Sequence, residues 1–137
     1  MQLEVTGRIQ NYIGGQCIDP VGGQYLDNVN PATGEVYSQI PDSGAADIAL
    51  AVAEAKKAFP AWSQSSGEYR FTLLNRIADL IDKHLDALAL AETNDNGKPL
   101  WLSRKVDIPR ASSNFRFFAT GAMHFAGESH SMPDEAI

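Results

Sequence analysis

Apolar residues recur every three or four positions over most of the chain after residue 43, which is the period of an α-helix with one buried face. The pattern predicts three or four one-sided helices, three of which carry long apolar stripes. Their apolar positions are Ile48, Val52, Ala55 and Phe59 in the first, Leu74, Ile77, Ile81, Leu85 and Leu88 in the second, and Ile108, Ala111, Phe115, Phe118, Ala122 and Phe125 in the third. Helices are therefore expected throughout residues 43–126.

Prolines, glycines and short polar side chains indicate where these helices begin and end. Ser or Asp at a helix start can accept a bond from an unpaired backbone N–H, whereas Pro beyond the first turn interrupts a helix. Trp62, just after a proline, is expected to turn into the core. The expected signals are caps at Ser43, in the box Ser65–Glu68 and at Asp107, stops at Pro60 and Asp95–Gly97, and a short helix over Lys98–Lys105.

Residues 8–41 carry short extended segments separated by turns. Two adjacent glycines between extended segments are typical of a tight hairpin, and Asn before Pro is driven out of the α region. We expect these strands to be short and antiparallel. The candidates are a hairpin over Asn11–Ile18 with Gly14-Gly15 at its turn, strands at Tyr25–Val29 and Glu35–Ile40, and a turn at Asn30–Gly34 between them.

The balance between helices and strands is uneven. Three or four one-sided helices present a large apolar surface, and the few short strands form too little sheet to cover it. The sequence therefore predicts a chain with both strands and helices whose helices need a partner surface that residues 1–137 do not supply. Either the chain oligomerises extensively or it is part of a longer polypeptide. Residues 127–137 are small and polar and are expected to form a tail.

A second stripe on the last helix carries candidate chemistry. Arg110, Asn114 and Phe117 follow the helical period beside the apolar stripe, so they bring a fixed charge, an amide and an aromatic ring together. A guanidinium can fork onto a carboxylate, and such a charge-assisted pair contributes about 1.5–3 kcal/mol. The alternative is a solvated arginine in the first turn of an amphipathic helix, and spacing alone does not decide between them.

Composition excludes several classes of protein. Hydrophobic residues make up 44% of the 137 residues and charged residues 20%, which is typical of a globular domain. Eleven basic against seventeen acidic residues give a net charge of −6, without a basic stripe, so nucleic acid and anionic membranes are poor partners. The sequence has no apolar run that would serve as a secretory signal or membrane span, and we expect a cytoplasmic protein.

Cysteine and histidine offer no catalytic or metal centre. Cys17 is the only cysteine and has no basic neighbour to lower its pKa, so it is interpreted as structural. A single cysteine excludes an internal disulfide and fits a reducing compartment. His84, His124 and His130 lack the spacing of metal ligands.

Four segments carry a recognisable family pattern: Asn30–Val36, Ala51–Ala55 with Phe59 and Trp62, Leu73–Ile81, and Glu92–Pro99. Together they resemble the N-terminal part of aldehyde dehydrogenases, and the similarity covers residues 8–126 in the family's order. The resemblance implies the aldehyde dehydrogenase-like α/β fold, in which these helices flank a parallel sheet that residues 1–137 do not supply, and it implies NAD as cofactor.

The start of the last helix resembles one branch of this family. Asp107–Arg110 followed by Asn114–Ala119 is similar to enzymes that oxidise 2-aminomuconic and 2-hydroxymuconic semialdehydes. The resemblance implies that Arg110 lies at the substrate tunnel and holds the acid end of the substrate, for which Arg offers bidentate geometry. Asn114 and Phe117 are then candidate neighbours in the tunnel wall, with simple packing as the alternative.

The resemblance also implies a monovalent cation site. Many members of the family bind Na⁺ or K⁺ before the Asn-Pro-x-Thr-Gly turn and at the Asp of Asp-Asn-Gly-Lys-Pro. The matching positions are Asn28, Val29 and Asp95. Oxygen ligands suit such hard cations. The alternative for Asp95 is a turn residue that binds local backbone.

The catalytic groups of the family are expected later than residue 137. The thiolate nucleophile, the glutamate base and most of the nicotinamide site have no counterpart in residues 1–137, so we expect this chain alone to be inactive. The parent enzyme would be a homo-dimer or tetramer that uses NAD. The alternatives are a betaine-aldehyde or aliphatic aldehyde dehydrogenase and a non-enzymatic helical interaction module. NAD against NADP and amino- against hydroxymuconic substrates stay open.

Overall fold

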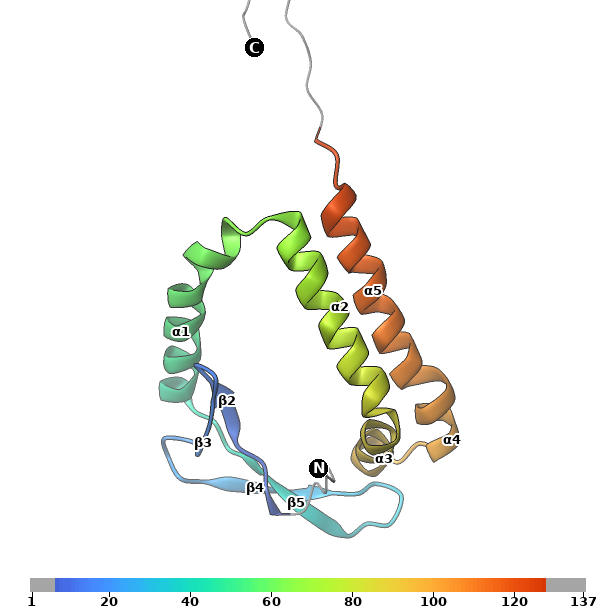
Figure 1. The fold of residues 1–137 in the computed structure, drawn as a ribbon. Coiled ribbons are helices and arrows are strands. Elements are labelled where there is room, and N and C mark those ends of the chain that lie inside the picture. Colours follow the sequence, from blue (N-terminus) through green and yellow to red (C-terminus); the bar gives the residue numbers. More distant parts are fainter. Residues whose placement is uncertain (1–6, 128–137) are drawn as a thin grey trace, which may run out of the picture.

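The structure is a computed structural model, and it describes residues 7–127. Short strands come first and helices follow, as the apolar pattern predicted (Figure 1). In chain order the elements are β1 (Gly7–Arg8), β2 (Asn11–Ile13), β3 (Gln16–Ile18), β4 (Tyr25–Val29), β5 (Val36–Pro41), α1 (Ala45–Ser63), α2 (Gly67–Lys83), α3 (Leu85–Asn96), α4 (Leu100–Leu102), the π-helical turn η1 (Ser103–Asp107) and α5 (Ile108–His124). The expected tail at 127–137 lies almost wholly outside the described residues.

The strands form a three-stranded sheet and a separate hairpin. β5 is the central strand, with β4 antiparallel on one side and β1 parallel on the other. β2 and β3 pair antiparallel, and Gly14 and Gly15 at their turn have φ angles of 62° and 82°, which a type I′ turn requires. The predicted hairpin is confirmed. The expectation of antiparallel strands holds for β2–β3 and β4–β5 but does not extend to β1.

The start of α1 differs from the prediction. Its N-cap is Gly44, not Ser43. The Asp47 carboxylate accepts the backbone N–H groups of Val21 at 2.8 Å and Gly44 at 2.9 Å, and these bonds hold the pKa of Asp47 below its usual value. Ser43 instead bonds the Asn11 side chain at 2.9 and 3.0 Å. The Asp47 carboxylate in the first turn therefore caps α1 and binds α1 to the loop between β3 and β4, which contains Val21.

α1 continues through Pro60 to Ser63, so the predicted stop at Pro60 is wrong. Carbonyl groups near the C-terminus of α1 accept hydrogen bonds from the Arg70 side chain. Arg70 Nη2 donates to the oxygens of Trp62 at 2.9 Å and Ser63 at 3.1 Å, and its guanidinium lies 5.3 Å over the Trp62 ring. A cation at a helix C-terminus also interacts favourably with the dipole. Trp62 is half-exposed and is not in a core.

The long predicted helix over residues 74–88 is two helices. α2 begins with Ser66 as its cap, whose Oγ accepts Tyr69 N–H at 3.1 Å, so the predicted box starting at Ser65 is one residue out of place. The chain leaves the helical conformation at His84, where α2 gives way to α3. The predicted end near Gly97 is confirmed, because Gly97 adopts the left-handed conformation that commonly closes a helix.

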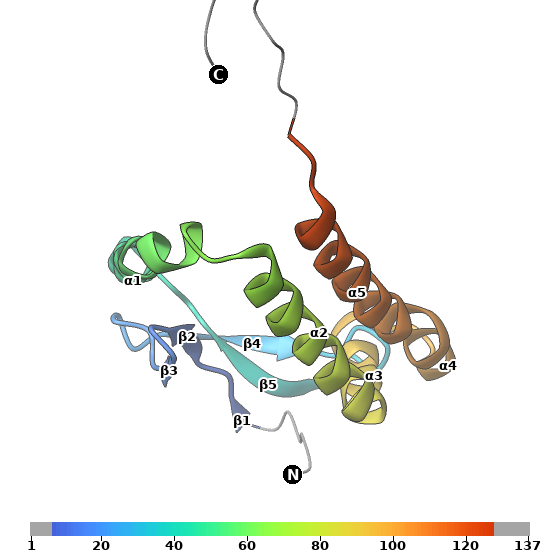
Figure 2. The ribbon, with the colours of Figure 1, turned by 45° about the horizontal axis from the view of Figure 1, so that its top comes forward.

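α2 and α5 run antiparallel and lie side by side in both views (Figures 1 and 2). Ala78 of α2 and Ser112 and Ala119 of α5 are buried between them. Ser112 Oγ donates to the Ala78 carbonyl at 3.5 Å. Small residues at this contact let the two backbones approach closely.

The buried stripe of α5 partly matches the predicted stripe. Ile108, Ala111, Phe115 and Ala122 are half-buried as predicted, whereas Phe118 and Phe125 are 64% and 89% exposed. The most buried positions are Ser112 and Ala119, which the prediction did not include. Small side chains, which carry no strong apolar signal, define the close approach to α2, and the large aromatics are left beside it.

The segment before α5 also differs from the expected single helix over Lys98–Lys105. α4 is a three-residue turn, and the chain then widens into the π turn η1, in which Ile108 N–H bonds to the Ser103 carbonyl five residues back. η1 runs directly into α5. The backbone of Asp107 is helical, and its side chain accepts no hydrogen bond from the first N–H groups of α5, so the predicted cap at Asp107 is wrong. Its carboxylate binds Lys98 instead.

Most large apolar side chains of the described residues are exposed. The fully buried apolar residues in this part of the chain are alanines, Ala78, Ala89 and Ala119. Large exposed side chains include Ile48, Val52 and Phe59 of α1 and Phe117, Phe118 and Phe125 at α5. In Figure 1 the ribbon of α1 stands apart from α2. Across residues 7–127, no helix is both long and apolar enough to cross a membrane.

Candidate functional site

The exposed side of α5 carries the three predicted substrate-binding residues. Arg110, Asn114 and Phe117 are all exposed, and their spacing of four and three residues places them on one face of a continuous helix. No ion pair within residues 7–127 involves Arg110. Its charge is therefore available to an anion from outside this part of the chain.

A hollow of about 360 Å³ lies beside this face. Asn114 lines it together with apolar side chains, and Arg110 and Phe117 do not; the other lining residues are Leu74, Ala111, Phe115 and Phe118. Phe117 packs edge-to-face on Phe118 with ring centroids 5.3 Å apart. The arrangement places one amide in an apolar hollow, with a cation one helical turn away. It suits a ligand that is apolar over most of its length and anionic at one end.

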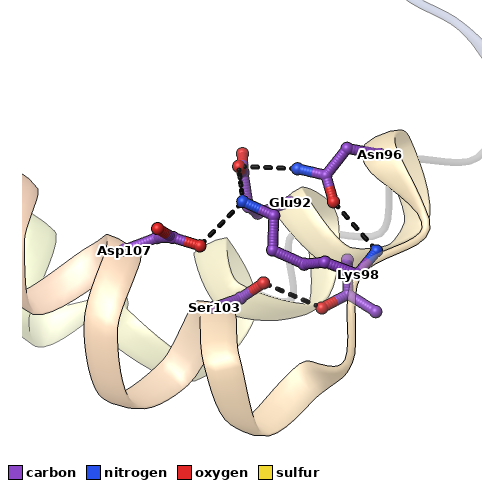
Figure 3. Close-up of polar contacts among 6 residues, drawn as sticks. Glu92, Asn96, Lys98, Ser103 and Asp107 are labelled. Carbon is purple, nitrogen blue, oxygen red and sulfur yellow. Dashed lines mark hydrogen bonds and ion pairs between the residues drawn. The ribbon is translucent and has the colours of Figure 1, made fainter.

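A cluster of polar side chains joins the end of α3 to η1, the turn that precedes α5 (Figure 3). Lys98 Nζ lies 2.8 Å from Glu92 Oε1 and 2.7 Å from Asp107 Oδ2, so it joins α3 to the last residue of η1. The two carboxylates raise the pKa of Lys98, with Asp107 the larger cause. Asn96 donates to Glu92 at 2.7 Å, and Thr93 and Ser103 share a hydrogen bond of 3.0 Å.

The structure brings Asn28 and Asp95 together through a residue that the sequence did not indicate. Between Asn28 and Val29 the pairing of β4 with β5 shifts by one residue, which leaves Tyr37 of β5 unpaired as a bulge. The Tyr37 hydroxyl accepts Asn28 Nδ2 at 2.8 Å and donates to Asp95 Oδ1 at 3.0 Å. Desolvation and the Asp95 bond raise the pKa of Tyr37.

The predicted Na⁺ or K⁺ site comprises Asn28 and Asp95 of this hydrogen-bonded group and the adjacent Val29 of β4. Asp95 supplies carboxylate oxygens, and the buried Ser38 Oγ nearby on β5 has no hydrogen-bond partner within the described residues. Oxygen donors of this kind fit a hard monovalent cation. Among residues 7–127, no group of three or more His, Cys, Asp or Glu side chains could hold a metal ion. The cation site stays a prediction.

A family model described as the aldehyde dehydrogenase family matches residues 18–137. This chain belongs to the aldehyde dehydrogenase family. The predicted resemblance is thereby confirmed, and so is the α/β fold class, because aldehyde dehydrogenases of known structure superpose closely on the chain.

Relatives of this aldehyde dehydrogenase chain are named for different substrates. The 2-aminomuconic semialdehyde dehydrogenase of Mus musculus is 45% identical over 124 residues, which cover 90% of this chain and 25% of the relative. A long-chain-aldehyde dehydrogenase of an Acinetobacter species is 47% identical over 118 residues, or 86% of this chain and 24% of the relative. The chain therefore spans about a quarter of the length of these relatives.

Solved structures also match nearly all of this chain while extending well beyond it. PnpE in complex with nicotinamide adenine dinucleotide has a TM-score of 0.89 at 37% identity, covering 98% of this chain and 26% of that protein. The NAD⁺ complex of the Bacillus cereus aldehyde dehydrogenase has a TM-score of 0.88 at 30% identity, covering 93% and 26%.

Sequence reasoning missed two residues that organise this part of the dehydrogenase fold. Tyr37 was assigned only to a strand, and it lies at a bulge of β5 from which its hydroxyl reaches Asp95 of α3. Lys98 was seen only as part of the Gly-Lys-Pro motif, and its partner Asp107 lies nine residues away with no local pattern linking them. The motif itself was the available signal for Lys98; for Tyr37 we find none.

The remaining reactive side chains are not gathered at this face. Cys17 is exposed on β3. His84 is half-buried at the junction of α2 and α3, and His124 is exposed at the end of α5. His130 lies outside the described residues.

Gly97→Ala is expected to destabilise this region. Gly97 has a φ of +75°, and an added Cβ would lie 2.9 Å from Pro31 Cγ and 3.2 Å from the Ala32 nitrogen. The left-handed conformation costs a residue with a Cβ about 1–2 kcal/mol, and the contact with the turn at residues 30–34 adds to it. A fall in the thermal unfolding midpoint of the protein measures the effect.

Gly34→Ala is the matched control. Gly34 has a φ of +74°, but nothing lies within 4 Å of its Cβ position. The control therefore carries the conformational cost without the close contact. Equal losses for the two variants would contradict the close packing of Gly97 against the turn.

Proposed function

We propose that this chain is the N-terminal portion of an NAD-dependent aldehyde dehydrogenase that oxidises a semialdehyde bearing a carboxylate, of the 2-aminomuconic or 2-hydroxymuconic type. The longer polypeptide that would contain it is called the complete enzyme below. The observation that carries the proposal is Arg110, an exposed guanidinium beside an apolar hollow, unpaired within the described residues. Relatives named 2-aminomuconic semialdehyde dehydrogenase support the substrate class.

The role of this chain in that enzyme is to bind and orient the substrate. A carboxylate at one end of the semialdehyde would pair with Arg110, and the apolar hollow with Asn114 would receive the rest. A bidentate pair fixes direction as well as distance, so the aldehyde end would be held toward the remainder of the enzyme. Phe117 would exclude water from one side of the pair.

Two features that could in principle bind a dinucleotide phosphate are used otherwise in this chain. Gly14-Gly15 forms a hairpin turn rather than a loop before a helix, and the N-terminus of α1 is already capped by Asp47. We therefore place NAD contacts, the nucleophile and the base in the rest of the complete enzyme. The NAD complexes among the structural relatives support this cofactor.

The exposed apolar faces of α1 and α5 are proposed to lie against the rest of that polypeptide, in a cytoplasmic homo-dimer or tetramer. The large exposed side chains on both helices support a missing partner. The unpaired Cys17 supports a reducing compartment.

Arg110→Met in the complete enzyme tests the substrate class. We expect kcat/KM for 2-hydroxymuconic semialdehyde to fall about tenfold to a hundredfold, the equivalent of about 1.5–3 kcal/mol, because the charge-assisted pair is lost. An aliphatic aldehyde should be oxidised as before. Lys105→Met, which removes an exposed cation from the preceding turn, is the control and should change neither substrate.

The second candidate is a dehydrogenase for neutral aldehydes, favoured by the 47% identical long-chain-aldehyde relative. Under that function Arg110→Met would affect acid-bearing and neutral substrates equally. Such a result would reject the carboxylate-bearing substrate and leave the family assignment intact.

A further inference from the structure

Asp107 precedes Arg110 by three residues and extends the line of Arg110, Asn114 and Phe117 toward the N-terminus of α5. Asp107, Arg110, Asn114 and Phe117 are spaced by three, four and three residues, and the backbone is helical at Asp107 as well as in α5. Side chains three residues apart on a helix are neighbours, and an Asp–Arg pair at this spacing is attractive. A free Asp107 carboxylate would therefore compete for the Arg110 guanidinium.

The Asp107 carboxylate instead forms an ion pair with Lys98. Its Oδ2 lies 2.7 Å from Lys98 Nζ, and both side chains are 26% exposed (Figure 3). Lys98 is in turn fixed by Glu92 Oε1 at 2.8 Å, which Asn96 orients from the other side. The ammonium group is held between two carboxylates from different elements and has little freedom to release Asp107.

The backbone keeps Asp107 within reach of Lys98. Ser103 at the start of η1 is fully buried and bonds to Thr93 of α3, while Asp107 ends η1 and bonds to Lys98 just beyond α3. The π turn between Ser103 and Asp107 contains one residue more than an α-helical turn, and each residue rotates the direction of the side chain by about 100°. The two bonds hold both ends of η1 against α3 and its C-terminal end. Arg110 lies about one helical turn after Asp107 and is outside these bonds.

We propose that Lys98 is a positioning residue that binds Asp107 and so keeps Arg110 unpaired for the carboxylate of the substrate. This inference rests on the proposed function, because the benefit of a free guanidinium requires an anionic substrate. Lys98 acts through Asp107 and does not touch the substrate. Removal of Lys98 would release a carboxylate next to Arg110, where it both pairs with the guanidinium and repels the incoming anion.

Lys98→Met in the complete enzyme is expected to raise KM for 2-hydroxymuconic semialdehyde about threefold to tenfold with little change in kcat. KM for an aliphatic aldehyde should stay the same. The double variant Lys98→Met/Asp107→Asn should return KM to within about twofold of the unmodified enzyme, because the competing charge is gone. Lys98→Arg should behave like the unmodified enzyme, and Lys105→Met is the control for loss of a cation.

The rescue separates this proposal from a structural role. If Lys98 only stabilised η1, adding Asp107→Asn would leave the defect or deepen it, and both substrates would suffer together. Either result overturns the proposal.

A crystal structure of the Lys98→Met enzyme gives a readout that needs no substrate. Asp107 should then lie within about 4 Å of the Arg110 guanidinium, the distance of an ion pair. An Asp107 that stays away from Arg110 overturns the inference whatever the kinetics. If the pair forms but Arg110→Met treats acid-bearing and neutral substrates alike, the proposed function fails and the competition between Lys98 and Arg110 for Asp107 stands.

Discussion

The purified 137-residue chain, incubated with NAD and 2-hydroxymuconic semialdehyde, is expected to produce no NADH above the rate without protein. Cys17 is the only thiol in the sequence, and it is exposed on β3 of a hairpin. No Lys, Arg or His forms an ion pair or hydrogen bond with it within residues 7–127, so no base in this part of the chain is placed to activate it as a nucleophile. Absorbance at the wavelength of NADH measures the rate directly.

Cys17→Ser is the control for this experiment. It should leave the absent activity and the spectrum of the chain unchanged. Turnover that disappears in Cys17→Ser would overturn the assignment of the catalytic groups to the rest of the complete enzyme. Turnover that persists in it would show a different nucleophile and would equally contradict the proposal.

The same sample tests the alternative of a self-sufficient helical interaction module. Phe117, Phe118 and Phe125 are 72%, 64% and 89% exposed, so the chain should bind an apolar dye and tend to associate on a sizing column. A compact monomer that binds no dye would favour the module. Under the proposed function, these exposed apolar faces pack against the rest of the complete enzyme.

Local chemistry made part of the fold predictable from sequence. The Gly14-Gly15 hairpin and the Gly97 helix end follow from backbone conformations that few other residues adopt, so a short window of sequence is enough. Helical periodicity likewise predicted α2 and α5. The boundaries at Ser43 and Pro60 failed, because capping by Asp47 and the Arg70 bonds to the end of α1 depend on side chains that a cap rule does not consider.

Non-local contacts made the rest unpredictable. The face of α5 that packs on α2 is chosen by Ser112 and Ala119, whose small size matters only opposite another helix. Tyr37 reaches Asp95 across 58 positions of sequence, and Lys98 reaches Asp107 across a π turn that no periodicity indicates. The stripe of Arg110, Asn114 and Phe117 was recognised because it lies on one helix, whereas the residue proposed to keep Arg110 free lies outside that helix.

Gly67→Ala is expected to destabilise the complete enzyme by about 1–3 kcal/mol through the contact of α2 with α5. Glycine to alanine within a helix ordinarily stabilises by about 0.4–1 kcal/mol, because the unfolded chain loses freedom. Here the added Cβ would lie 2.6 Å from the Ala122 carbonyl oxygen and 3.5 Å from Met123 Cα. Both are backbone atoms, so the helices must separate to relieve the contact.

Gly121→Ala provides a control of opposite sign on the same pair of helices. Gly121 lies within α5 and nothing lies within 4 Å of its Cβ position, so this variant should gain the ordinary stabilisation of about 0.4–1 kcal/mol. The midpoint of thermal unfolding and hydrogen exchange of the α2 and α5 amides measure both variants. A stabilising Gly67→Ala would mean that α2 and α5 are further apart than described. The carbonyl of Ala122 would then no longer limit their approach, and the hollow beside Asn114 would change shape with them.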